Sequence, residues 1–146
     1  MTQKTTVINS KYAQDRRRWV LIDAKQAVLG RVASKAANLL RGKNKNFFSP
    51  SVDCGDFVIV TNAQNVKLTG EKAITKTYFR HSGYAGGAKV IPFKLQMEKD
   101  ARKVIEAAVK GMLPATRLRQ HQMRRLKIYN GDQHPHAAQK VEAVSV

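Results

Sequence analysis

Two short apolar runs with a helical pattern between them constrain the fold more than any other feature of the chain. The runs cover residues 19–22 and 57–60. Because their hydrophobicity is continuous rather than alternating, each run is typical of a strand buried on both faces, as in a parallel sheet. Apolar residues between 29 and 40 recur at helical spacing, and Gly42 is placed to end this helix. Strand, helix and strand in this order predict an α/β fold with a right-handed crossover and a parallel sheet.

The second half of the chain continues the alternation. Residues 95–110 carry a second amphipathic pattern, which Gly111 and Pro114 bring to an end, and residues 126–129 form a last strand-like run. A chain of 146 residues is long enough to bury a core without metal or disulfide cross-links. We therefore expect a single domain over residues 1–146, with an extended polar arm at 1–15 and a tail at 132–146.

The charge balance indicates an anionic partner. The chain has 27 Lys and Arg residues against 10 Asp and Glu residues, a formal net charge of +17. A surface with this excess repels itself unless a polyanion neutralises it, and nucleic acid is the usual partner. An anionic membrane would require a basic amphipathic helix or a lipid anchor, and neither helical pattern separates its charges in that way. Because the basic residues are spread along the whole chain, we expect contacts on several sides.

The stretch at residues 78–89 is the strongest candidate for such a contact. It contains three glycines and no acid, and aromatic residues are interleaved with basic ones. A glycine-rich backbone lets a rigid polyanion approach, cationic groups suit phosphate oxygens, and aromatic rings suit unstacked bases. The open alternative is an ordinary solvated hairpin loop with a packed tyrosine. The candidate contact residues in this stretch are Arg80, His81, Ser82, Gly83, Tyr84, Gly86, Gly87 and Lys89.

Further basic groups are candidates for contact with nucleic acid. They are a run of three arginines at 16–18, a polar loop at 43–46 and an acid-free segment at 115–125. For the arginine run, a solvated start of the first strand is an equally open interpretation. His134 and His136 flank a proline and could bind a metal, but two ligands without cysteine or a carboxylate cluster are weak evidence for a metal site. We therefore interpret them as part of a surface tail near phosphate. The candidates in the first three groups are Arg16, Arg17, Arg18, Lys43, Lys45, Arg117, Arg119, Arg124 and Arg125.

Sequence motifs for catalysis are absent. The chain contains no Walker loop, no G-x-S-x-G and no H-E-x-x-H motif. We interpret Asp53 and Asp56 as stabilising a turn by local hydrogen bonds rather than as a catalytic or metal-binding pair. Cys54 is the only cysteine, so no intramolecular disulfide can form, and we expect a cytoplasmic protein. We expect no enzymatic activity, cofactor or metal. The rival hypotheses are an enzyme that binds a nucleotide at the carboxyl ends of the strands, and a protein that coats DNA or regulates mRNA.

Several motifs in one order and spacing together resemble one known family. They are Trp19 with Ile22-Asp23-Ala24, Leu29-Gly30-Arg31-Val32-Ala33-Ser34, Leu40-Arg41-Gly42-Lys43, Val52-Asp53 with Gly55-Asp56, Lys67-Leu68-Thr69-Gly70, Arg80-His81-Ser82-Gly83-Tyr84 with Gly86-Gly87, Val109-Lys110-Gly111-Met112-Leu113-Pro114, Leu126-Lys127-Ile128-Tyr129 and His134-Pro135-His136-Ala137-Ala138-Gln139. Over most of its length the chain resembles the bacterial and organellar form of the L13 family of large-ribosomal-subunit proteins.

The resemblance implies a fold and a function. The fold would be a three-layer α/β/α domain on a mainly parallel four-stranded sheet. The function would be structural: binding large-subunit ribosomal RNA early in assembly, beside other large-subunit proteins, with no membrane and no small-molecule substrate. The sequence departs from the usual pattern at Ser51, Ala85 and Arg119, where histidine, proline and glycine are common. Loss of the proline loosens the 78–89 stretch, and Arg119 adds charge to the C-terminal basic segment.

Overall fold

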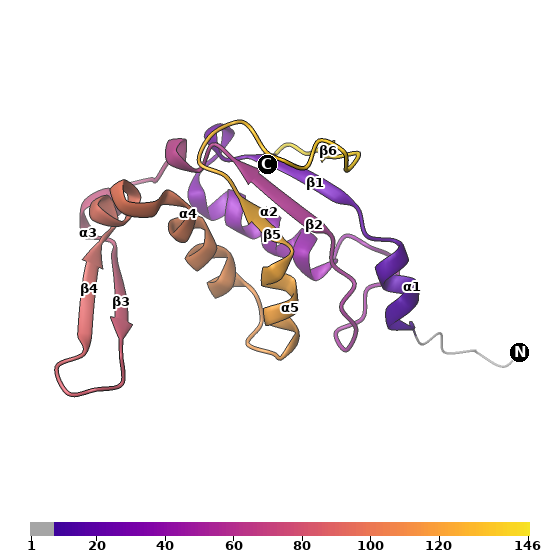
Figure 1. Ribbon diagram of the computed structural model, residues 1–146, viewed down its shortest axis with the longest axis horizontal. Coiled ribbons are helices and arrows are strands. Elements are labelled where there is room, and N and C mark those ends of the chain that lie inside the picture. Colours follow the sequence, from indigo (N-terminus) through magenta and orange to yellow (C-terminus); the bar gives the residue numbers. More distant parts are fainter. Residues whose placement is uncertain (1–7) are drawn as a thin grey trace, which may run out of the picture.

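The fold is organised on a four-stranded parallel sheet. A computed structural model describes residues 8–146. The strands are β1 (Trp19–Asp23), β2 (Phe57–Thr61), β5 (Leu126–Ile128) and β6 (Glu142–Ala143), in the order β5-β2-β1-β6 (Figure 1). Every neighbouring pair of these strands is parallel, and Val20 lies opposite Val58 on the two central strands. The predicted α/β class and four-stranded parallel sheet are confirmed.

One face of the sheet is covered by two long helices. They are α2 (Leu29–Arg41) and α4 (Phe93–Met112), which pack against each other (Figure 1). Alternate residues of β1 and β2 join the same buried cluster as the apolar stripes of both helices. Gly42 ends α2 in the left-handed conformation, with φ at +79°, as the sequence predicts. In α4 the helical dihedral angles are interrupted at Asp100, whose carboxylate accepts a hydrogen bond from the backbone N–H of Arg102 at 3.1 Å.

The opposite face of the sheet is covered by the C-terminal segment. Trp19 and Phe57 stack there with ring centroids 4.3 Å apart, and the ring of His136 lies 5.0 Å from that of Trp19. The His136 side chain is held by the hydroxyl of Tyr129, at 2.8 Å from Nε2. The orange to yellow chain in Figure 1 follows this path past β5 toward β6. This segment takes the place that a helical layer has in the predicted three-layer arrangement.

The remaining helices are short. They are α1 (Ser10–Asp15), α3 (Lys72–Thr75), α5 (Leu118–Arg124), and the 3₁₀ turns η1 (Ala24–Gln26) and η2 (Ala63–Asn65). Helix α1 corrects the prediction of an extended arm, because Asn9 caps its first turn and Ala13 is fully buried. Residues 1–7 of the predicted arm lie outside the described residues. Across residues 8–146, the helices are all too short or too polar to cross a lipid bilayer.

The glycine-rich stretch is the turn of an antiparallel hairpin. Strands β3 (Thr77–His81) and β4 (Ala88–Pro92) pair only with each other and project away from the sheet (Figure 1). Gly83 and Gly86 have φ of +92° and +71°, a conformation that glycine adopts without steric cost. The turn is closed by hydrogen bonds from the Gly87 N–H to Tyr84 O and from the Ser82 N–H to Gly87 O. The three predicted glycine positions therefore shape the tip.

Replacing Gly87 with Ala is expected to loosen the tip while the body stays folded. An added Cβ would lie 2.1 Å from Ser82 Oγ and 2.9 Å from Tyr84 O, so the hydrogen bonds of the turn must lengthen. A local loss of about 1.4 kcal/mol corresponds to about tenfold faster exchange of the Ser82 and Gly87 amide protons. Hydrogen exchange followed by NMR measures this. The prediction would be contradicted by unchanged exchange rates at both amides. It would also be contradicted if the amides of β1 and β2 exchanged faster by the same factor as those of the turn.

Candidate nucleic-acid interface

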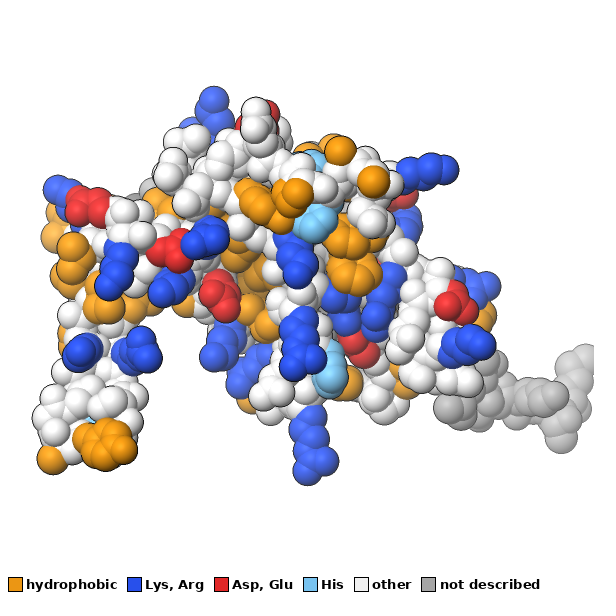
Figure 2. Space-filling view, viewed as in Figure 1, with side chains coloured by type: hydrophobic (Ala, Val, Ile, Leu, Met, Phe, Trp, Pro, Cys, Tyr) orange, Lys and Arg blue, Asp and Glu red, His pale blue; other side chains and the backbone are white. Residues whose placement is uncertain are grey.

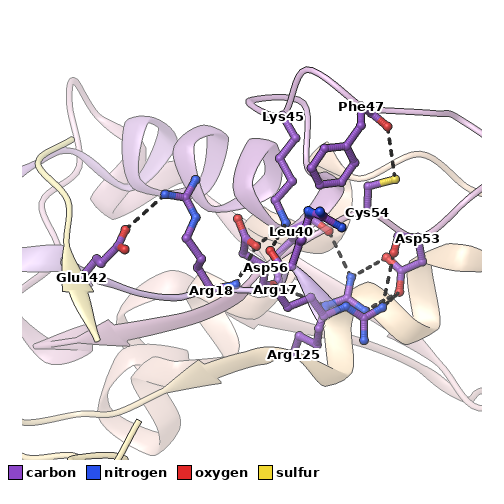
Figure 3. Close-up of polar contacts among 11 residues, drawn as sticks. Arg17, Arg18, Leu40, Lys45, Phe47, Asp53, Cys54, Asp56, Arg125 and Glu142 are labelled. Carbon is purple, nitrogen blue, oxygen red and sulfur yellow. Dashed lines mark hydrogen bonds and ion pairs between the residues drawn. The ribbon is translucent and has the colours of Figure 1, made fainter. Parts of the chain in front are cut away.

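A buried ion-pair cluster joins three distant parts of the chain. Arg125 is only 5% exposed, and its guanidinium binds both carboxylate oxygens of Asp53 and donates to Leu40 O at 3.2 Å (Figure 3). Arg17 Nη2 donates to the same carboxylate at 3.1 Å. Burial, and after it the like charge of Arg125, lowers the pKa of the Arg17 guanidinium below its ordinary value. Asp53 thus holds together the chain before β1, the loop before β2 and the end of α5, where Arg125 is the C-cap.

A second buried carboxylate lies beside this cluster. Asp56 is fully buried, and its Oδ1 accepts from the Arg18 backbone N–H at 2.9 Å and from Lys45 Nζ (Figure 3). Lys45 Nζ also donates to Arg16 O at 3.2 Å. The interpretation of Asp53 and Asp56 as local turn stabilisers was therefore wrong. Both carboxylates bind groups that are distant in sequence, which a local pattern does not reveal.

These pairs divide the predicted contact residues near the N-terminus into two kinds. Arg17 and Lys45 direct their charges into the protein, whereas Arg16, Arg18 and Lys43 are exposed. The Arg16 guanidinium lies over the ring of Tyr12, 3.6 Å from its centroid. The fold brings the arginine run and the 43–46 loop to one hollow of about 580 Å³. We call the exposed cations Arg16, Arg18 and Lys43 the N-terminal basic surface.

The C-terminal basic segment lies on and beside α5. Arg117 and Arg124 are exposed and Arg119 is half-buried, whereas Arg125 belongs to the buried cluster. Arg119 and Arg124 line a hollow of about 460 Å³ together with Lys110 of α4. Figure 2 shows a column of Lys and Arg side chains over β5 and α5. We call Lys110, Arg117, Arg119 and Arg124 the α5 basic surface. Sequence reasoning missed Lys110, because its place beside α5 depends on how α4 packs.

The hairpin carries the predicted residues of the central stretch. Arg80 and Lys89 are exposed and lie directly opposite each other on β3 and β4. The side chain of Tyr84 is 79% exposed, so the packed-tyrosine alternative does not hold for the tip. Tyr78, at the base, is instead half-buried against the core, and this burial raises the pKa of its hydroxyl. The hairpin therefore presents cations and an aromatic ring to the outside.

Of the two histidines of the C-terminal segment, His136 contacts aromatic residues of the body. Both are half-buried, and His136 bonds Tyr129 and contacts Trp19. Within residues 8–146, no three His, Cys, Asp or Glu side chains gather as a metal would require. Contact of His134 or His136 with nucleic acid stays a prediction.

Comparison with known proteins places this sequence among ribosomal proteins. The family model described as "Ribosomal protein L13" matches residues 17–135. The large ribosomal subunit protein uL13 of Symbiobacterium thermophilum is 48% identical over 143 residues, which cover 98% of this chain and 99% of that protein. The uL13 of a Nocardioides species is 56% identical over 124 residues, covering 85% and 84%. The uL13 of Pelobacter propionicus is 49% identical over 137 residues, covering 94% and 96%.

Proposed function

Because the chain belongs to the ribosomal protein L13 family, and is thus a structural protein of the large ribosomal subunit rather than an enzyme, we propose that it binds large-subunit ribosomal RNA and assists early subunit assembly. Its place would be the cytoplasmic ribosome, where its other partners would be neighbouring large-subunit proteins. As a ribosomal constituent it takes part in translation. The RNA contacts are proposed for the N-terminal basic surface, the α5 basic surface and the hairpin.

The observation that carries this proposal is the separation of exposed and buried charge. The carboxylates of Asp53 and Asp56 point inward, where they neutralise Arg17, Lys45 and Arg125. Among the described residues, Arg18 pairs with Glu142 at 3.5 Å, and the other cations of the three surfaces have no carboxylate partner, so their charge is left for an external polyanion. Since buried ion pairs need well-placed partners, the inward cations serve to hold the surfaces in place rather than to bind phosphate.

The spacing of the three surfaces supports contact with folded RNA rather than with one short strand. The hairpin projects from one end of the molecule, and α1 with the N-terminal basic surface lies toward the other (Figure 1). A-form RNA is bound mainly through phosphates and 2′-hydroxyls, and its sequence is read where bases are unpaired. We propose phosphate contacts for Arg80 and Lys89, and contacts of the tip for residues 81–84, Gly86 and Gly87. A protein bound at several sites would fix the relative orientation of RNA helices.

Replacing both Arg117 and Arg124 with Gln tests the proposal. Both side chains are exposed on the α5 basic surface, so the variant should fold normally. Loss of two phosphate contacts flattens the slope of log K against log salt by about one to two units. Filter binding to large-subunit ribosomal RNA, over a salt series and with excess duplex DNA as competitor, measures that slope.

Lys25 and Lys140 supply the matched control. Both are exposed and lie outside the three surfaces, so their replacement by Gln removes the same charge. This control should keep the wild-type slope. A wild-type slope in the double arginine variant, or equal flattening in the control, would overturn the assignment of the α5 surface. Abolition of wild-type binding by duplex DNA would overturn specific recognition of RNA.

A further inference from the structure

The hairpin has two chemically different faces. Side chains alternate between the faces along a strand, and residues directly opposite each other share a face. Arg80 pairs with Lys89, which makes one face cationic, and Tyr78 on that face packs toward the body. Phe79 pairs with Val90, and His81 with Ala88, so the other face is apolar and aromatic.

The apolar face is open to solvent. The side chains of Phe79 and Val90 are 69% and 60% exposed. The rings of Phe79 and His81 are 6.3 Å apart and within 27° of parallel. The His81 ring is held in place, because its Nδ1 accepts a hydrogen bond from the Gly83 N–H at 2.9 Å. Two oriented rings therefore stand side by side on one exposed face.

The charges around this face indicate its partner. Between Glu71 and Glu98 the chain has no acid, and it carries Lys72, Lys76, Arg80, Lys89 and Lys94. A neighbouring protein with an apolar patch would gain nothing from this concentration of positive charge. An unpaired nucleobase combines an apolar π-face with a phosphate backbone, and so it matches both the rings and the cations.

We propose that Phe79 and His81 form a stacking platform for unpaired bases of the ribosomal RNA, while Arg80 and Lys89 neutralise phosphates on the opposite face of the hairpin. The inference rests on the proposed RNA-binding function and deepens it. It assigns recognition of single-stranded RNA to one face of the hairpin. The exposed basic surfaces on the body bind backbone without requiring unpaired bases.

Two substitutions of Phe79 test the platform. Phe79→Leu keeps an apolar side chain but removes the π-face, and Phe79→Trp keeps it. The probes are large-subunit ribosomal RNA and a fully paired RNA duplex. Phe79→Leu should weaken binding to the ribosomal RNA about 5- to 150-fold, the loss typical of one stacked base. Phe79→Trp should bind like the wild type. Neither should change the salt slope or the affinity for the duplex.

A fluorescence measurement gives a second readout. In a Trp19→Phe background, Phe79→Trp leaves one tryptophan on the platform, and stacking on a base should quench its emission when the ribosomal RNA binds. Equal binding by Phe79→Leu and wild type, or unquenched emission, would overturn the platform, as expected if a protein covered this face. Failure of the proposed function would give a different result, because duplex DNA would then displace the ribosomal RNA from the wild-type protein itself.

Discussion

Replacing Asp53 with Asn should lower the free energy of unfolding by about 3–5 kcal/mol, because it leaves a buried charge without its counter-ion. Asn has nearly the shape of Asp, so the packing is kept. The guanidinium of Arg125 would stay buried beside Leu40 O with no carboxylate, and Arg17 would lose the same partner. Urea denaturation followed by circular dichroism measures the loss.

The surface pair between Arg18 and Glu142 is the matched control for Asp53. Both side chains are more than half exposed, and their atoms are 3.5 Å apart. Glu142→Gln makes the same chemical change, yet it should cost less than about 1 kcal/mol, as exposed pairs do. If the two variants lost equal stability, burial of the Asp53 cluster would not be what makes it strong.

Replacing Gly55 with Ala should destabilise the fold by about 3 kcal/mol or more, beyond the usual cost of an overpacked core. A Cβ at this position would lie 1.7 Å from Leu40 O and 2.9 Å from Arg125 Nη2. Neither neighbour can move freely, because the carbonyl belongs to the last turn of α2 and accepts from the same guanidinium. The melting temperature and the midpoint of urea denaturation should both fall.

Gly30 offers the opposite result from the same substitution. It lies within α2, and an added Cβ would meet nothing within 4 Å. Gly30→Ala should therefore raise the free energy of unfolding by up to about 1 kcal/mol, since alanine has a higher helix propensity than glycine.

A Gly55→Ala variant as stable as the wild type would contradict the prediction for Gly55. It would show that the α2 terminus and the loop before β2 separate easily.

The central strands and the two long helices follow from local patterns in the sequence. Val58, Ile59 and Val60 of the apolar run at 57–60 are all buried, so the hydrophobicity of the run is continuous. Gly42 marks the end of α2 by its left-handed backbone. Helix α1 escaped prediction because one capping residue and one buried alanine leave little periodicity in six residues. The two-residue strand β6 is exposed and depends on pairing with β1.

The candidate contact surfaces follow from the sequence only in part. Absence of acids identified the central stretch and the segment around α5. Which cations are exposed could not be inferred, since Arg124 and Arg125 are adjacent yet one is free and the other buried. Burial of Arg125 depends on Asp53, which lies 72 positions away. The apolar face of the hairpin likewise depends on the register between β3 and β4.

The order of the partners of Asp53 along the chain has a consequence for synthesis. Arg17 precedes this carboxylate and Arg125 follows it by 72 residues. Because the polypeptide is synthesised from its N-terminus, the residues of β1, α2 and β2 are made long before Arg125, whose guanidinium completes the buried cluster. Contacts between residues so far apart form late, because closing a long segment costs entropy first. A nascent chain therefore reaches its native packing only after α5 has left the ribosome that makes it.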